Sequence, residues 1–180
     1  MKNEKNNQEK SNTAIKLKQT TAGAAFAAVI FAATFLAHIP VPMTNGYVHL
    51  GDAFIFIAAS LLPPFLSVPA AIIGASLADL LGGFPIYIPA TVVIKAATVL
   101  CFTHRKRKLL CLHNLIALAA AVVLCAGGYY LYEAVVIYKN YAGPAVNIPA
   151  NMLQAGVSAL ILILFAAAVD RTPRLRTFFK

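Results

Sequence analysis

Long apolar stretches follow one another along most of this chain, separated only by short polar or proline-rich interruptions. A membrane-spanning helix needs roughly 20 apolar residues, and stretches of that order recur from Thr20 almost to Asp170. The apolar regions are 20–38, 53–78, 88–102, 115–138 and 148–169. We expect Asn147 to cap the last helix, with Pro149 in its first turn. The pattern predicts an all-α integral membrane protein.

The region 53–78 contains no charge, so it crosses the membrane either once as one long helix or twice as two short ones. Three prolines favour two pieces, since proline removes a backbone donor and restricts the residue before it: Pro63, Pro64 and Pro69. With two crossings, the basic run 105–108 falls on the same side as both termini. The positive-inside rule therefore selects a bundle of six transmembrane helices, with both termini in the cytoplasm.

Both ends of the chain are polar and basic. Residues 1–18 form a cytoplasmic arm without hydrophobic periodicity, expected to be irregular or helical only at its end. Residues 171–180 form a basic tail, and 19–170 make up the six-helix domain. The first apolar stretch is long, follows a charged arm and lacks an obvious cleavage site, which favours a retained helix over a cleaved signal. Of the 15 Lys and Arg residues, 13 fall in the arm, the 105–108 run or the tail, and the other two are Lys95 and Lys139.

Composition and motifs exclude several classes of function. With 60% hydrophobic and 12% charged residues, the chain is too apolar for a water-soluble domain. The net charge of +9 lies in clusters beside apolar spans and not on a folded polar face, which argues against nucleic-acid binding. Cys101, Cys111 and Cys125 have no metal-ligand spacing. Without a nucleophile elbow, an HExxH motif or a Walker loop, we expect no enzyme activity, no cofactor, no metal site and no ATP hydrolysis by this chain.

Four charged residues lie within or at the ends of the apolar regions, where charge is expensive and usually functional: Asp52, Asp79, Lys95 and Glu133. In the six-span topology the three carboxylates approach the outer face and Lys95 lies deeper. Lys95 either forms a structural ion pair with Asp79 or meets an anionic group of a ligand. Both roles remain open from the sequence, and both could hold in different states.

Polar and aromatic residues gather at the same outer end, including Asn151 and Gln154 on one face of the last span. Two explanations other than a binding site are open for these residues. The tyrosines could form an interfacial belt, and the amides could form hydrogen bonds between helices. We predict an outward-facing substrate site formed by Asn45, Tyr47, His49, Tyr87, Thr91, Lys95, Glu133, Asn151 and Gln154. Tyr129, Tyr132 and Ser158 lie near this cup.

The first apolar helix carries small residues at four-residue intervals: Ala24, Ala28 and Ala32. Such a ridge lets another helix approach closely. The partner is either a helix of the same chain or a separate subunit.

Two sequence blocks resemble a known family of transport proteins. They are YVHLGDAFIFIAASLLPP and AAIIGASLADLLGGFPIYIPATVVIK, with Gly51-Asp52, Ala78-Asp79-Leu80, Gly82-Gly83 and Pro85 as signature positions. Together they are similar to the substrate-binding S components of energy-coupling factor (ECF) transporters, in particular the riboflavin-transporter-like branch. The resemblance covers residues 47–95, and the hydropathy agrees over the whole chain.

The resemblance implies a six-helix protein of the bacterial-type plasma membrane that captures a vitamin or a vitamin precursor outside the cell. It implies a transmembrane coupling subunit and two ATP-binding subunits as partners, with Ala24, Ala28 and Ala32 meeting the coupling subunit. It also implies that the protein topples in the membrane to release its substrate. Riboflavin, pyridoxine-like, hydroxymethylpyrimidine-like and nicotinate-like substrates remain open. The alternatives are an autonomous secondary transporter of a small metabolite and a structural membrane protein without a ligand.

Overall fold

The computed structural model describes residues 2–37, 39–40, 47–104 and 108–172. The elements in chain order are α1 (Lys2–Leu36), β1 (Ile39–Pro40), β2 (Tyr47–Val48), α2 (Gly51–Leu61), α3 (Pro64–Leu81), η1 (Pro85–Tyr87), α4 (Ile88–Leu100), α5 (Leu112–Tyr132), η2 (Glu133–Ile137), η3 (Gly143–Asn147) and α6 (Ile148–Arg171). β1 and β2 pair antiparallel, with Ile39 opposite Val48. The described chain is therefore helical, as predicted, apart from one minimal ladder that the sequence did not indicate.

The region 53–78 consists of two helices, as the prolines indicated. Pro63 is extended and precedes the first residue of α3, and Pro64 occupies the first turn, where a missing N–H costs no helical bond. Pro69, in contrast, lies inside α3, so its expected role as a helix break is wrong. The break at Pro63 sends the chain from α2 directly into α3.

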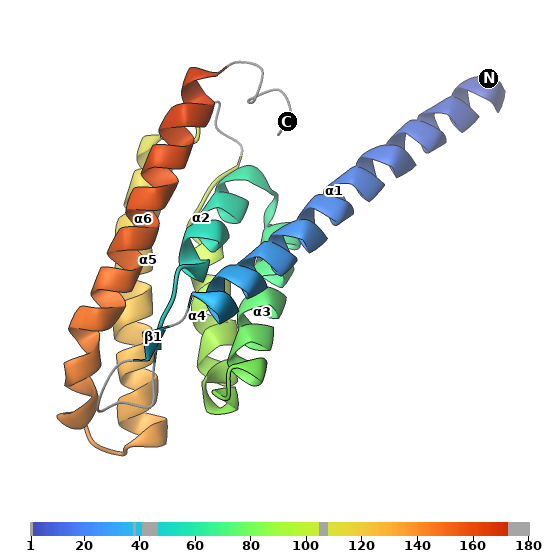
Figure 1. Cartoon of the computed structure of the whole chain (residues 1–180). Helices are drawn as coiled ribbons and strands as arrows, with labels where there is room; N and C mark the ends of the chain where they lie inside the picture. Colours follow the sequence, from blue (N-terminus) through green and yellow to red (C-terminus); the bar gives the residue numbers. More distant parts are fainter. Residues whose placement is uncertain (1, 38, 41–46, 105–107, 173–180) are drawn as a thin grey trace.

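The amino-terminal arm is helical from Lys2, which corrects the expectation of an irregular arm. The arm contains no glycine or proline, and its Lys, Glu and Gln residues lose little rotamer freedom in a helix, so the apolar helix continues backwards through it despite the Asn residues. Figure 1 shows these first turns of α1 projecting beyond the other helices.

Four helical segments are long and apolar enough to cross a membrane: Ile15–Leu36, Pro64–Leu81, Leu112–Ile137 and Gly143–Arg171. Two shorter apolar helices, Gly51–Leu61 and Pro85–Leu100, complete the bundle. The 11 residues of α2 extend about 16 Å at 1.5 Å per residue, about half of a typical hydrocarbon core. Length and composition therefore indicate a multi-pass membrane protein in which some helices are short.

The distribution of side chains is that of a protein solvated by lipid. Val123 and Leu164 are 71% and 63% exposed, whereas Asp52 and Lys95 are 0% and 1% exposed. Apolar side chains outside and charged side chains inside are costly in water but favourable in a bilayer. The apolar interior, around Phe56, fills the rest of the bundle.

Helix α1 packs mainly on α3 through a close backbone approach. A Cβ added at Gly74 would lie 2.6 Å from the carbonyl oxygen of Ala27 and 2.9 Å from Cβ of Ile30. Ala24 and Ala28 face away from this contact and are exposed, while Ala32 is half-buried. Packing within the described part of the chain therefore does not account for Ala24 and Ala28.

Two polar side chains hold the end of the bundle at which α4 and α6 end and α5 begins. They bind backbone groups of the α4–α5 connection. Asp170 accepts the backbone N–H groups of Leu109 and Leu110, both at 3.0 Å. Asn114 accepts the N–H of Thr103 at 2.9 Å and donates to carbonyl oxygens of Thr103 and Leu109. These contacts hold the described ends of the basic loop against α5 and α6.

We predict that Gly74→Ala lowers the melting temperature of the detergent-purified protein. The new methyl group would push α1 from α3, and overpacking of this kind costs about 1–3 kcal/mol. Gly156→Ala is the matched control, because it lies within α6 and an added Cβ would meet no atom within 4 Å. The control should equal the parent or gain up to about 1 kcal/mol. Identical melting temperatures for Gly74→Ala and the parent would contradict the close α1–α3 contact.

Candidate functional site

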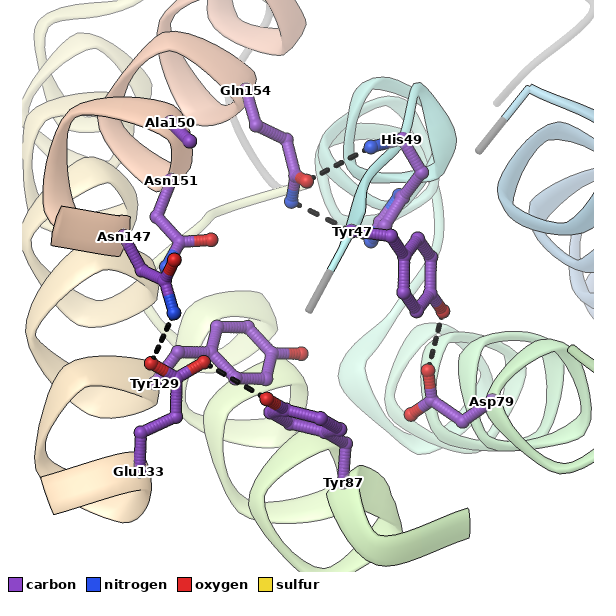
Figure 2. Close-up of a pocket in the computed structure, with 10 residues that line it drawn as sticks. All are labelled: Tyr47, His49, Asp79, Tyr87, Tyr129, Glu133, Asn147, Ala150, Asn151 and Gln154. Carbon is purple, nitrogen blue, oxygen red and sulfur yellow. Dashed lines mark hydrogen bonds between the residues drawn. The ribbon is translucent and has the colours of Figure 1, made fainter. Parts of the chain in front are cut away.

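A polar pocket opens where β2, the end of α3, η1, the α5–η2 junction and the start of α6 meet (Figure 2). Its lining residues are Tyr47, His49, Asp79, Tyr87, Tyr129, Glu133, Asn147, Ala150, Asn151 and Gln154. About 450 Å³ of space, including the open mouth, lies among them. Polar and aromatic groups converging on one hollow of an otherwise apolar bundle are typical of a small-molecule site.

Tyr47 joins the first loop to the end of α3. Its hydroxyl donates to Oδ1 of Asp79 at 2.5 Å, and its ring centroid lies 4.6 Å from that of Phe84. Burial, reinforced by the Asp79 carboxylate, raises the pKa of Tyr47 above its ordinary value. The Tyr47 hydroxyl therefore stays protonated and donates its hydrogen bond to Asp79.

Gln154 ties the first loop to α2. Its Oε1 accepts the backbone N–H of His49 at 2.9 Å, and its Nε2 donates to Oδ2 of Asp52 at 2.9 Å. The backbone donor fixes the orientation of the amide, because only the oxygen of the side chain accepts. His49 in turn accepts the N–H of Gly51 at Nδ1, at 3.0 Å, which places the ring proton on Nε2.

Lys95 forms a buried ion pair with Asp52. Its Nζ lies 2.6 Å from Oδ1, and the two side chains are 1% and 0% exposed. A pair with Asp79 was one of the two roles that the sequence left open, and the structure instead pairs Lys95 with Asp52. The ammonium group also lies 5.2 Å from the centroid of the Tyr129 ring, within cation–π range. Lys95 thus lies behind the pocket wall with its charge balanced by Asp52.

A chain of hydroxyl groups connects Asp79 to Tyr129. Thr91 donates from Oγ1 to Oδ2 of Asp79 at 2.6 Å, and the same oxygen lies 3.1 Å from the Tyr129 hydroxyl. Thr91 has a single hydroxyl proton, already used on Asp79, so Tyr129 must be the donor in the second bond. The Tyr129 proton is therefore directed at Thr91.

Glu133 is positioned by the only π-helical turn in the described part of the chain, η2. The wider turn is closed by the Tyr138 N–H, which donates to the Glu133 carbonyl oxygen at 2.8 Å. Such turns are frequent at functional sites because they redirect a side chain. The carboxylate accepts from the Tyr87 hydroxyl at 3.0 Å and from Nδ2 of Asn147 at 2.6 Å.

Asn147 occupies the expected position before α6, but its side chain makes no capping bond. The amide instead reaches across to Glu133, on the preceding helical segment. The prediction of a side-chain cap is therefore wrong. Competition with an ion–dipole bond explains the difference, since a hydrogen bond to a carboxylate is worth more than one to a neutral backbone group.

The structure brings most of the predicted site residues to one pocket: Tyr47, His49, Tyr87, Glu133, Asn151 and Gln154. Thr91 and Lys95 lie behind them and act through Asp79 and Asp52. Asn45 falls outside the described residues.

The predicted site omitted four lining residues: Asp79, Tyr129, Asn147 and Ala150. The sequence contained a signal for the first three, which are polar groups near span ends in an apolar chain. Asp79 was considered as a possible ion-pair partner of Lys95, and Asn147 was expected to cap the last helix. Ala150 carries no chemical signal and lines the pocket through its position in the first turn of α6.

Comparison with known protein families gives a match over residues 14–171 to the family described as ECF-type riboflavin transporter, S component. The match includes all four candidate membrane spans of the described chain and all ten residues of the pocket. The chain belongs to this family. The family is one of substrate-binding transporter subunits and not of enzymes.

A curated relative shares a shorter segment with this S component. It is a protein of Pyrococcus woesei described as "Uncharacterized protein in gap 3'region", 39% identical over 62 residues. The aligned segment is 34% of this chain and 41% of that protein, so the S component matches about two fifths of the relative's length.

We predict that Lys95→Met and Asp52→Asn each lower the melting temperature strongly. Removing one partner of a buried ion pair leaves an uncompensated charge and costs about 3–5 kcal/mol. The double variant should recover much of this loss, which a double-mutant cycle measures. The cycle of Lys95→Met with Asp79→Asn is the control and should show the weaker coupling. Stronger coupling of Lys95 to Asp79 than to Asp52 would overturn the assigned pair.

Proposed function

We propose that the chain crosses the membrane six times, with both termini in the cytoplasm and the pocket facing outward. The basic clusters support this orientation. Lys108 and Arg171 are exposed at the end of the bundle opposite the pocket, as the positive-inside rule requires of a cytoplasmic face. The short helices α2 and α4 then span by local thinning of the bilayer or by burial of their ends in the bundle.

In this orientation the S component captures a vitamin or a vitamin precursor at the outer face. The observation that carries this proposal is the pocket itself, in which acidic, amide and phenolic groups from seven elements meet around one space. The family description names riboflavin, which makes riboflavin the first candidate ligand. The rings of Tyr47, Tyr87 and Tyr129 would cover a flat heterocycle, and Asn151 would bind its polar edge.

Release on the cytoplasmic side requires energy from other subunits. We propose that a transmembrane coupling subunit and two ATP-binding subunits of the ECF type supply it, in the plasma membrane of a bacterial-type cell. The exposed Ala24 and Ala28 support an intersubunit contact along α1, because small residues allow close helix approach and no helix in the described part of the chain covers them.

We predict that one B vitamin or precursor raises the melting temperature of the purified chain and that Asn151→Ala weakens its binding. A ligand that binds only the folded state must stabilise it. Loss of one neutral hydrogen bond, about 0.5–1.5 kcal/mol, weakens affinity roughly 2- to 10-fold. Leu153→Ala is the control, since Leu153 is 68% exposed on the same helix. If no vitamin or precursor shifts the melting temperature, the capture role is wrong and a structural role is favoured.

We also predict that Ala28→Leu impairs assembly without impairing ligand binding. The larger side chain would hold the coupling subunit away from α1 and reduce its co-purification about tenfold, equivalent to ~1.4 kcal/mol. Ala25→Leu is the matched control, because Ala25 is equally exposed but lies off the ridge. Reconstituted uptake should need ATP and the coupling subunit. Uptake by this chain alone, abolished by a protonophore, would instead establish a secondary transporter.

A further inference from the structure

The described residues that line the pocket carry two carboxylates, those of Asp79 and Glu133, and include no Lys or Arg side chain. Each carboxylate oxygen already accepts one hydrogen bond from the protein. A carboxylate oxygen has two lone pairs, so each keeps a further acceptor site. The carboxylates therefore remain available to donors of a ligand while their present bonds hold them in place.

The hydroxyl protons of the wall point away from a ligand. Tyr47 donates to Asp79, Tyr87 donates to Glu133, and Tyr129 donates to Thr91. A phenol has one proton, so each of these oxygens has only acceptor capacity left. In Figure 2 the three hydroxyl groups border the space enclosed by the labelled residues. The tyrosines thus reinforce the acceptor character of the carboxylates.

An independent observation concerns the amide of Asn147. Its Nδ2 is bound to Glu133, which fixes the orientation of the group, and its Oδ1 is buried without a hydrogen-bond partner among the described residues. A buried acceptor left unpaired destabilises the folded state, because it has lost its hydrogen bond to water. Asn147 lines the pocket, so a ligand donor placed there would remove that cost.

The nearest buried cation does not offset these acceptors. Nζ of Lys95 lies 2.6 Å from Asp52, whose other oxygen receives Nε2 of Gln154. His49 accepts the N–H of Gly51 at Nδ1, so that nitrogen carries no proton. The donors that the described wall can still offer a ligand include the second N–H of the Asn147 amide and the amide of Asn151. An anionic ligand would face two carboxylates without a Lys or Arg side chain among the described lining residues, and like charges held together repel one another.

We propose that this pocket selects its ligand by charge and by the direction of hydrogen bonds. It takes an uncharged or cationic heterocycle that carries several O–H or N–H donors, and it rejects the carboxylated or phosphorylated form of the same compound. Glu133 and Asp79 are the specificity-determining residues. The inference rests on the proposed capture of a small molecule in this pocket, and it removes nicotinate-like anions from the admissible substrates.

Matched ligand pairs test the proposal on the full chain in detergent, by calorimetry at low salt. The pairs are riboflavin and flavin mononucleotide, pyridoxine and its 5'-phosphate, and nicotinamide and nicotinate. The last pair differs in charge with almost no difference in size. In the pair that contains a ligand of this pocket, we expect the uncharged compound to bind at least 100-fold tighter than the anionic compound. An anionic member that binds as tightly as its partner overturns the charge rule and leaves capture intact. If no member of any pair binds, the proposed capture is overturned, and the charge rule with it.

Variants locate the selectivity. Glu133→Gln keeps the size of the side chain and an acceptor for Tyr87 but removes one negative charge from the wall. We expect the ratio of neutral to anionic affinity to fall about tenfold, and Asp79→Asn provides the same test if Glu133→Gln does not fold. Asp170→Asn, at the opposite end of the bundle, is the control and should leave the ratio unchanged. An unchanged ratio in folded Glu133→Gln or Asp79→Asn overturns the assignment of these residues.

Discussion

The ion pair between Lys95 and Asp52 determines how the rest of the polar interior is organised. A lone ammonium or carboxylate at this depth would destabilise the fold, because a medium of low dielectric solvates charge poorly. The attraction between the two opposite charges offsets this cost. Asp52 has a second oxygen, and that oxygen receives the amide of Gln154, whose own oxygen then holds the backbone of His49. One buried pair therefore connects α2, α4, α6 and the first loop. The position of the loop over the pocket follows from satisfying a charge in the core.

The same requirement explains why the pocket wall is rich in acceptors. A carboxylate in an apolar bundle needs donors, and the tyrosine, threonine and asparagine side chains near Asp79 and Glu133 supply them. A proton that is donated to Asp79 or Glu133 cannot also be donated to a ligand. The pocket therefore presents mainly oxygen lone pairs to a ligand.

Much of this arrangement could be predicted from the sequence, because hydropathy places helices and helix ends gather polar residues. The separation of α2 from α3 followed from Pro63, and the outer cup followed from the positions of Tyr47, Tyr87 and Gln154 along the chain. The carboxylate that pairs with Lys95 could not be predicted in the same way. Asp52 and Asp79 both lie at ends of helices near Lys95, and the rotation of each helix about its axis decides which carboxylate reaches the ammonium. The π-helical turn at Glu133 and the unpaired oxygen of Asn147 likewise depend on three-dimensional packing.

The attachment of the basic loop at the opposite end rests on contacts of another kind. Asp170 and Asn114 bind backbone groups of Thr103, Leu109 and Leu110 in the α4–α5 connection. Amide N–H and C=O groups are the same for every residue except proline, so these bonds place almost no demand on which side chains the three positions carry. In evolutionary terms, the three positions can change their side chains while the same bonds hold the connection to α5 and α6.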